Sequence, residues 1–376
     1  MPRRAVVLGA GIAGLTAAIA LRRAGYAVTV HDRAPTLDPA GAALSLWPNA
    51  MQALSLIGAA DRIGTEAAPI ASISSARRDG RPIFGPLRID AVIAGGEAYL
   101  PTRTFLQNCL LDALGDVPIQ LGQELDTIED IDTRPVVRLA DGTRIVADLV
   151  IDATGIWSAT ATRLIGNPPT YRGYGGVIAL SDALPPLPPG CSSEFWGEGE
   201  RFGLFDAGGG RRYWFYMRNQ PANATIGLSD VRARTSGWPA VVTDSVAGTA
   251  AAALIPFAIH ARGLPRRLGA GRVICVGDAV HAMEPNLGQG ACQAIEDAAA
   301  LAMLAPRCEP DALLPAFETA RLARIRRFMR RSRSGGYGAH GGALTRTATR
   351  LVFGMIPPAV QRRMMAGMLT LPDYAP

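Results

Sequence analysis

The chain has 376 residues, 48% of them hydrophobic and 19% charged, and a formal net charge of +6. This length and composition predict one large domain or two closely joined domains with a sizeable core. No apolar run is long enough to span a bilayer, and five scattered cysteines without paired spacing indicate neither a disulfide framework nor a metal site.

All of the basic residues except four histidines are arginines, because the chain contains no lysine. Schiff-base chemistry on lysine is therefore excluded. The positive net charge suits an anionic cofactor or substrate, or simply solubility. The first strand begins at Arg4 with no cleavable signal before it, so we expect a cytoplasmic protein.

Residues 4 to 33 have the pattern of a strand, a glycine-rich turn, a helix and a second strand. The strands cover Arg4 to Leu8 and Ala27 to Val30, and the helix runs from Leu15 to Arg23. The turn between them reads Gly9-Ala10-Gly11-Ile12-Ala13-Gly14. This order predicts a Rossmann-type βαβ unit that binds a dinucleotide, and the alternative is a plain tight turn.

Individual residues of this unit have expected roles. Gly9 makes the tight turn, Gly11 admits the pyrophosphate to the helix N-terminus, and Gly14 permits close helix packing. Asp32 stands where an acid binds the ribose hydroxyls of an adenosine half. Its neighbour Arg33 is a further candidate for cofactor binding.

The amino-acid composition changes in residues 171 to 228, where aromatic and β-branched runs are broken by Gly, Asp and Pro. This pattern predicts antiparallel strands and hairpins. The proline-rich segment SDALPPLPPG, residues 181 to 190, is expected to be a surface loop.

A second glycine-rich segment, GDAVHAMEPNLGQGACQAIEDA, spans residues 277 to 298. It follows a buried strand, crosses a loop that contains Pro285, and enters a helix at Gly288-Gln289-Gly290. Glycines let the backbone approach a flat ring, and a helix start favours the negative charge of a reduced flavin. Asp278 can accept hydrogen bonds from ribityl hydroxyls. Because a nicotinamide dehydrogenase has no use for a second such loop, the two segments together predict FAD.

The order of residues in this segment resembles the second FAD-binding motif of the flavoprotein aromatic hydroxylases, the single-component class A flavin monooxygenases. Residues 41 to 54 resemble the family's loop beside the flavin, and Arg103 resembles its pyrophosphate-side arginine. The resemblance implies that Asp278 holds the ribityl chain and that Pro285 shapes the reactive C4a edge. It also implies that Gly288, Gln289 and Gly290 face the pyrimidine half of the ring.

The function implied by the resemblance is that of an FAD-dependent monooxygenase. Such an enzyme inserts one oxygen atom from O2, through a C4a-hydroperoxyflavin, into an aromatic or other electron-rich small molecule, with NAD(P)H as reductant. The predicted sheet would be its substrate-covering domain, although alternation puts only half of the sheet residues on the pocket face. The candidate pocket residues are Leu46, Phe195, Phe205, Trp214 and Tyr216. No general base is identified, since the family resemblance makes His281 structural.

Residues 149 to 158, LVIDATGIWS, depart from the family pattern. Thr154 occupies the family's acid position and Ala161 its arginine position. In the family this motif serves both FAD and the approach of NAD(P)H, so reduction by NADH, by NADPH or by a separate reductase stays open. The alternative is that Asp152 simply ends a buried strand.

Seven arginines lie between Arg321 and Arg333, with apolar residues at helical spacing among them. They predict a solvated helix or a contact with an anionic partner, such as a membrane surface or NADPH. Nucleic acid is not expected, because no aromatic residues are interleaved with the arginines. The segment after Arg333 is expected to form one or two helices packed outside the FAD domain. A methionine-rich lid or a shallow peripheral membrane contact is the alternative.

Other functions remain compatible with the sequence. An epoxidase or N-hydroxylase of the same fold would act on a hydrophobic substrate, and Asn286 and Cys292 in the motif are reminiscent of epoxidases. A flavin reductase or oxidase would release peroxide without oxygenating a product, and a non-catalytic FAD-binding redox protein would show no substrate-stimulated reduction. A flavin halogenase is disfavoured by the absence of lysine.

The predicted fold class is α/β, a Rossmann-type FAD-binding domain interleaved with an antiparallel β-sheet substrate domain and followed by C-terminal helices. The FAD-binding domain is expected to comprise residues 1–70, 98–165 and 268–332. The sheet domain would comprise residues 71–97 and 166–267, and residues 333–376 would form the helical tail.

Overall fold

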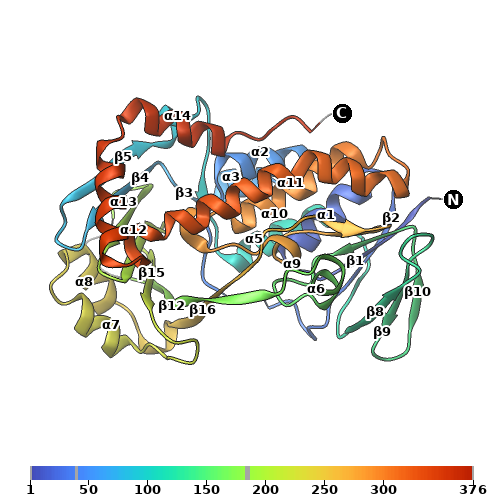
Figure 1. Ribbon diagram of the computed structural model, residues 1–376, viewed down its shortest axis with the longest axis horizontal. Coiled ribbons are helices and arrows are strands. Elements are labelled where there is room, and N and C mark those ends of the chain that lie inside the picture. The colour runs from blue at the N-terminus through green and yellow to red at the C-terminus, as the bar shows by residue number, and fades with distance from the viewer. Residues whose placement is uncertain (1, 39–40, 183–186, 375–376) are drawn as a thin grey trace.

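Two β-sheets at opposite ends of the molecule are joined by a long helix that runs along one side of both (Figure 1). The computed structural model describes residues 2–38, 41–182 and 187–374. Residues 183–186 of the predicted proline-rich loop therefore lie outside the described residues. None of the helices that the structure describes is both long and apolar enough to cross a membrane.

The first sheet has six strands in the order β17-β18-β11-β1-β2-β7, and its central strands are parallel. Its strands are β1 (Arg4–Leu8), β2 (Ala27–His31), β7 (Ile119–Gln120), β11 (Leu149–Asp152), β17 (Gly269–Ala270) and β18 (Val273–Cys275). Both faces are covered, which explains why these strands are runs of buried apolar residues. The Rossmann-type unit predicted from the N-terminal sequence is confirmed.

Helices α1 (Ile12–Arg23), α2 (Pro48–Ile57) and α10 (Gly290–Leu304) pack against one another beside this sheet. Their contact faces are rich in alanine, including Ala17, Ala18 and Ala298, each of which is buried. Small side chains allow the helix axes to approach closely. The remaining helices of this half are α3 (Asp61–Glu66), α5 (Arg103–Leu114), α6 (Ala159–Ile165), α9 (Asp278–His281) and the 3-10 turn η2 (Pro285–Leu287).

The second sheet has seven strands in the order β16-β12-β15-β14-β13-β4-β5. The strands are β4 (Ser72–Arg77), β5 (Pro82–Arg88), β12 (Pro169–Ser181), β13 (Cys191–Trp196), β14 (Glu200–Asp206), β15 (Arg212–Asn219) and β16 (Ile255–Arg262). All neighbours are antiparallel except β13 and β4. Helices α7 (Leu228–Thr235) and α8 (Ala240–Ala247) cover one face and close a separate apolar core with it. The other face is directed toward the six-stranded sheet.

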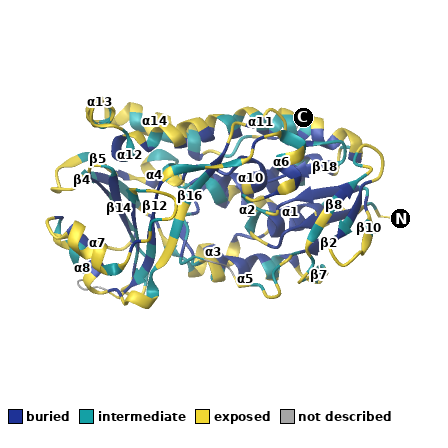
Figure 2. Ribbon diagram, turned by 60° about the horizontal axis from the view of Figure 1, so that its bottom comes forward, coloured by how far each residue is buried: buried dark blue, intermediate teal, exposed yellow. Residues whose placement is uncertain are grey.

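Smaller elements complete the fold. Strands β8 (Leu125–Glu129), β9 (Val136–Leu139) and β10 (Arg144–Val146) form a three-stranded sheet, and β3 (Ala68–Pro69) pairs with β6 (Tyr99–Leu100). The other short elements are α4 (Ile89–Val92) and the 3-10 turn η1 (Ala251–Ala253). Burial is concentrated in the two sheets and in α1 and α10 (Figure 2).

The C-terminal segment differs in part from the expectation. Helix α11 (Pro310–Gly335) is followed by α12 (Tyr337–His340), α13 (Ala343–Met355) and α14 (Pro358–Leu369). Helix α14 packs against α2 and α4, but α13 packs against β5 and the end of β13. The tail therefore covers both halves of the molecule, where the sequence predicted packing on the FAD domain alone.

Candidate functional site

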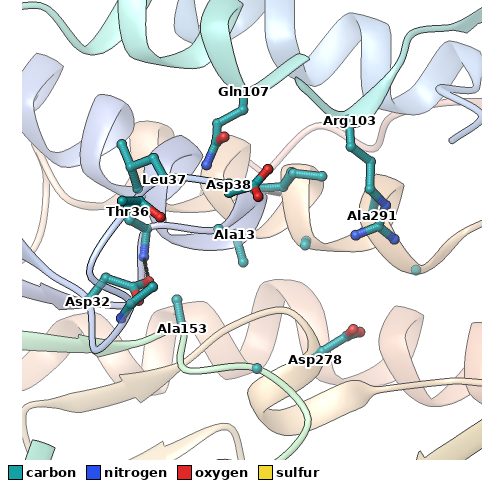
Figure 3. A pocket seen from close by; sticks show the side chains of 17 residues that line it. Ala13, Asp32, Thr36, Leu37, Asp38, Arg103, Gln107, Ala153, Asp278 and Ala291 are labelled. Carbon is teal, nitrogen blue, oxygen red and sulfur yellow. Dashed lines mark hydrogen bonds between the residues drawn. The ribbon is translucent and has the colours of Figure 1, made fainter. Parts of the chain in front are cut away.

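A cavity of about 360 Å³ lies at the carboxyl ends of β1, β2 and β11. It brings together five of the predicted cofactor-binding residues, namely Gly11, Asp32, Arg103, Asp278 and Gly290. Figure 3 shows Arg103 reaching from α5 toward α10, with Asp278 on the opposite side and Asp32 at the other end. Ligands of open α/β sheets bind at this edge, where the carboxyl ends of the strands meet.

Three helix N-termini meet at this cavity. Gly11 and Ile12 at the start of α1, Arg103 at the start of α5, and Gly290 at the start of α10 all line it. Each N-terminus carries a partial positive charge, although at the start of α5 the N–H groups of Arg103 and Phe105 are already bound by Ala42 and Thr102. Together with the guanidinium of Arg103, they make a site for an anionic ligand such as a pyrophosphate.

The three glycines of the N-terminal turn have different surroundings. Gly9 has a φ of +104°, and a Cβ there would lie 2.3 Å from the carbonyl oxygen of Ala153. A Cβ at Gly14 would lie 1.8 Å from the carbonyl oxygen of Gly9, so the start of α1 is pressed against the turn. Gly11, in contrast, faces open space, with no atom within 4 Å of a Cβ at that position. Of these three glycines, therefore, only Gly11 leaves room for a ligand.

Asp32 is held in place by the backbone at the end of β2. Its two carboxylate oxygens accept hydrogen bonds from the N–H groups of Ala10 at 2.6 Å and Ala34 at 2.8 Å. The carboxylate thus reaches across to the glycine turn while its remaining lone pairs stay available to ligand hydroxyls. Its neighbour Arg33 is exposed and does not line the cavity.

Gln107 was not identified from the sequence. It lies one helical turn after Arg103 on α5, is 8% exposed, and lines the same cavity. The sequence signal that could have identified Gln107 is a polar residue four positions after the arginine, on the helix face that carries Leu106 and Leu110. Thr36, Leu37 and Asp38 also line the cavity, but the sequence offers no periodic signal for this irregular segment.

In the segment that departs from the family pattern, residues 149–158, polar groups are bound by one another and by Arg262 of β16. The carboxylate of Asp152 accepts hydrogen bonds from the N–H and Oγ1 of Thr154, at 3.0 and 2.6 Å, and from the hydroxyl of Ser158. The guanidinium of Arg262 then binds the carbonyl oxygens of Ile156 and Ser158. These contacts agree with a structural end to β11, and among residues 149–158 only Ala153 and Gly155 line the cavity.

The loop of the second glycine-rich segment is fixed by α2 and the residues before it. Gly288 has a φ of +60°, and its carbonyl oxygen accepts a hydrogen bond from Nε1 of Trp47 at 3.1 Å. Nδ2 of Asn49 donates to Oε1 of Gln289 at 2.9 Å. Pro285 begins the 3-10 turn η2 that leads into Gly288. The predicted loop residues thus form one rigid turn before α10.

A buried ion-pair network lies beneath this loop. Glu296 and Asp297 of α10 are no more than 1% exposed, and both pair with Arg321 of α11, at 2.6 and 2.8 Å. Asp297 also accepts hydrogen bonds from the ring of His281 at 2.7 Å and from the N–H of Gly277 at 2.9 Å. Burial opposes the charge of Asp297, but the attraction of His281 and Arg321 is larger and lowers the pKa of this carboxyl.

This network corrects the interpretation of the arginine-rich segment as a solvated helix. Arg321 is fully buried, and Arg324 binds both carboxylate oxygens of Glu296 at 2.7 Å. The other arginines of the segment are partly or fully exposed. The prediction of a solvated helix is therefore correct for one side of α11 and wrong for the side that faces α10.

Three of the five predicted pocket residues do not face the cofactor half. Phe195, Trp214 and Tyr216 lie in the apolar core between the seven-stranded sheet and helices α7 and α8. Nε1 of Trp214 donates to Oγ1 of Thr249 at 3.0 Å within that core. Their assignment to a substrate pocket is therefore corrected, because alternation in β13 and β15 points them to the covered face. Leu46 is fully buried in the core of the FAD-binding half.

Phe205 is directed to the opposite face, toward the six-stranded sheet. It packs against the core of the FAD-binding half, and its ring lies 5.8 Å from that of Tyr213 and 6.5 Å from that of Phe215. Burial raises the pKa of Tyr213 to about 12, and the positive charge of Arg103 opposes this shift only in part. The sequence identified this aromatic group only in part, and two of its members, Phe205 and Tyr213, pack against the core of the FAD-binding half.

The cavity fits FAD on the chemistry of its residues. The helix N-termini and Arg103 suit the pyrophosphate, and Asp32 lies where the ribose of the adenosine half would be. Asp278 and the start of α10 lie at the other end of the cavity, where the ribityl chain and flavin would extend. When bound, FAD supplies the oxygen-activating redox chemistry that no side chain of this chain provides.

Comparisons with known proteins agree with this fit. The family described as "FAD binding domain" matches residues 3–332. The aurachin C monooxygenase/isomerase of Stigmatella aurantiaca is 34% identical over 86% of both chains. An FAD-dependent urate hydroxylase of Klebsiella pneumoniae is 31% identical over 88% of both chains.

Solved structures show the same fold. The crystal structure of Klebsiella pneumoniae HpxO complexed with FAD and uric acid has a TM-score of 0.88 and 27% identity. The alignment covers 98% of this chain and 96% of that one. The chain therefore belongs to the FAD binding domain family and is an FAD-dependent monooxygenase of the flavoprotein aromatic hydroxylase type.

Proposed function

We propose that this enzyme inserts one atom of O2 into a planar, electron-rich small molecule bound between the flavin loop and the inner face of the seven-stranded sheet. NAD(P)H is the proposed reductant. The observation that carries the proposal is the aromatic group Phe205, Tyr213 and Phe215 on that face, with Tyr213 near enough to Arg103 of the cofactor cavity for the positive charge to affect its pKa. Aromatic side chains of this kind bind flat apolar ligands.

The proposed cofactor contacts follow from the site. Gly11 and Arg103 would hold the pyrophosphate, Asp32 the ribose, and Asp278 the ribityl hydroxyls. Pro285 and the turn from Gly288 to Gly290 would form the wall beside the reactive edge of the ring. Because Gly288 and Gln289 are fixed by Trp47 and Asn49, this wall would exclude water without moving during the reaction.

A buried arginine on the same face supports a substrate with an anionic or carbonyl oxygen. Arg201 is 1% exposed and lies over the ring of Phe215, 5.3 Å from its centre. Its Nη1 is 3.4 Å from a carboxylate oxygen of Glu194, while Nε and Nη2 have no partner among the described residues. Buried guanidinium N–H groups are normally satisfied, so we propose that a substrate oxygen binds there.

The names of relatives are compatible with this chemistry. They include urate hydroxylases, an aurachin C monooxygenase/isomerase and a 3-amino-4-hydroxybenzoate 2-monooxygenase. Each of these names belongs to the relative. For this chain they guide the choice of compounds in the first experiment.

The decisive experiment is anaerobic stopped-flow reduction of the purified yellow protein by NADH or NADPH, with and without purines, quinolones and aminohydroxybenzoates. We expect one compound class to accelerate bleaching of the flavin, and 18O2 to label the product by one atom. Product analysis then separates hydroxylation from epoxidation or N-hydroxylation. Peroxide release without labelled product for every compound, or flavin that no nicotinamide reduces, would contradict the proposal in its present form.

A further inference from the structure

Helix α13 exposes its apolar face. Ala348 and four larger apolar residues, Leu344, Leu351, Val352 and Met355, recur at helical spacing, and all five are exposed. Leu344 is 89% exposed and Met355 is 72% exposed. Figure 2 shows α13 and much of α14 as exposed along one edge of the molecule.

The polar face of α13 is turned toward the protein. Arg346 donates to the carbonyl oxygen of Gly341 at 2.8 Å, and Arg350 donates to the carbonyl oxygens of Gly338 and Gly197. Phe353 contacts the edge of Trp196. These contacts fix the rotation of α13 about its axis. A helix on the surface of a water-soluble protein normally has the reverse orientation.

Helix α14 extends the same surface. Val360 and Met364, four residues apart, are 46% and 45% exposed, and Arg362 and Arg363 beside them are exposed. We call Leu344, Leu351, Val352, Met355, Val360 and Met364 the apolar stripe. All six side chains are exposed in the part of the chain that the structure describes, and apolar residues gathered on the exposed sides of successive helices mark an interaction site.

The C-terminal segment that contains the apolar stripe is basic. Residues 319–372 contain eleven arginines and no aspartate or glutamate, whereas the rest of the chain contains 27 arginines and 32 acidic residues. Seven of the eleven lie on α11, where Arg321 and Arg324 pair with acids of α10. The other four, Arg346, Arg350, Arg362 and Arg363, lie on α13 and α14. Burial, together with repulsion by Arg346, Arg77 and Arg78, lowers the pKa of Arg350, and Glu198 only partly offsets this.

The neighbouring acids do not neutralise this surface. Asp79, in the turn between β4 and β5, pairs with Arg81, and Asp90 of α4 pairs with Arg88. Each of these two acids thus has an arginine partner, and Glu198 is a further acid close to Arg350. The surface around α13 and α14 keeps its positive charge.

We propose that α13 and α14 bind the surface of an anionic phospholipid bilayer, with the apolar stripe inserted at the level of the headgroups and the exposed Arg362 and Arg363 of α14 beside it. An apolar face flanked by arginines is the pattern of helices that lie in the plane of the interface. Helix α13 has 13 residues, which is too few to span a bilayer. A second copy of the chain fits less well, because a two-fold contact through this surface would place like charges opposite one another.

The test is co-sedimentation of the FAD-loaded protein with vesicles of phosphatidylcholine alone or of phosphatidylcholine and phosphatidylglycerol in equal amounts. The principal variant is Leu351→Glu with Met355→Glu. The matched control is Leu264→Glu, because Leu264 is also an exposed apolar side chain but lies outside α13 and α14. Flavin absorbance and the melting temperature verify that each variant is folded, and neither readout depends on turnover.

We expect the unmodified protein to bind the phosphatidylglycerol vesicles at least tenfold more tightly than the neutral vesicles, with binding weakened by added salt. The double variant should lose at least tenfold in affinity, and Leu264→Glu should bind like the unmodified protein. Equal binding to both vesicle types, or a double variant that binds normally, overturns the proposal. A dimer in sedimentation equilibrium that the double variant abolishes, without vesicle binding, also overturns it and assigns the surface to a second copy.

Discussion

The guanidinium of Arg321 and the carboxylate of Glu296 form a fully buried ion pair, with 2.6 Å between Nη1 and Oε2. Tyr374 completes the group, since its hydroxyl lies 2.7 Å from both Nη1 of Arg321 and Oε2 of Glu296. Asn49 binds the other oxygen of the same carboxylate at 2.7 Å and Gln289 of the flavin loop at 2.9 Å. The loop that would face the flavin is therefore anchored to α11 and to the C-terminal segment.

Replacement of Arg321 by Met is expected to destabilise the protein strongly. The change leaves the carboxylates of Glu296 and Asp297 buried without their common partner, which typically costs about 3 to 5 kcal/mol. Urea denaturation of the FAD-loaded protein measures the loss. Arg327→Met, an exposed arginine on the same helix, should stay within about 0.5 kcal/mol of the unmodified protein. Equal effects of the two changes would mean that the buried pairs contribute nothing.

Removal of the arginine that lines the cofactor cavity should weaken FAD binding. Arg103→Ala is expected to raise the Kd for FAD by roughly ten- to a hundredfold, the loss of a charge-assisted contact worth about 1.5 to 3 kcal/mol. Arg33→Ala is the control, since Arg33 is exposed outside the cavity. Fluorescence titration of the apoprotein measures both. A larger loss for Arg33→Ala would reverse the assignment of the two residues.

Neighbouring aromatics on β15 should respond differently to substitution because they lie on opposite faces of the sheet. Trp214→Ala empties part of the core beneath α7 and α8, so we expect a loss of roughly 3 to 5 kcal/mol in the free energy of unfolding. Phe215→Leu should leave stability nearly unchanged and alter kcat/KM for the substrate found by stopped flow. Thermal melts and steady-state kinetics on both variants test this. If only the Trp214→Ala protein has an altered kcat/KM while remaining folded, the substrate binds instead on the face covered by α7 and α8.

His340 should make stability depend on pH. Burial, with the positive charge of Arg201 as a second cause, lowers the pKa of His340 to about 3. The unfolded chain, with a histidine pKa of about 6.5, binds the proton more tightly. Stability is therefore complete above about pH 6.5 and falls with decreasing pH toward 3, by up to about 1.4 kcal/mol per unit. His340→Phe, which can keep the stacking on Tyr174, should reduce this slope in urea titrations from pH 7 to 5. Equal slopes for both proteins would show that His340 does not contribute.

The sequence predicted those parts of the fold that depend on local patterns. The glycine spacing from Gly9 to Gly14 and the buried strands around it define a βαβ unit within about 30 residues. The predicted helix after Gly288 begins at Gly290 and ends at Leu304, as expected from its run of helix formers. In both segments the backbone conformation requires particular residue types, so one sequence is enough to predict these elements.

Other parts depend on contacts between distant residues. Alternation in β15 shows that Trp214 and Phe215 face opposite sides, but only the position of α7 and α8 decides which side is covered. The arginines of α11 look alike in sequence, and the packing of α10 alone determines that Arg321 is buried. The exposed face of α13 could not be predicted for the same reason, because an amphipathic pattern does not say which face meets the protein.

Tyr374 belongs to the buried group of Arg321 and Glu296, so this group can be completed only when the end of the chain has been synthesised. The N-terminal βαβ unit leaves the ribosome first, whereas Tyr374 follows Glu296 by 78 residues. At roughly 5 to 20 residues per second, these residues take about 4 to 16 s to synthesise. During that interval α10 and its glycine turn exist without their last buried partner. We therefore expect a nascent chain that ends before Tyr374 to capture FAD weakly, and the cofactor to be retained only once the C-terminal segment has docked.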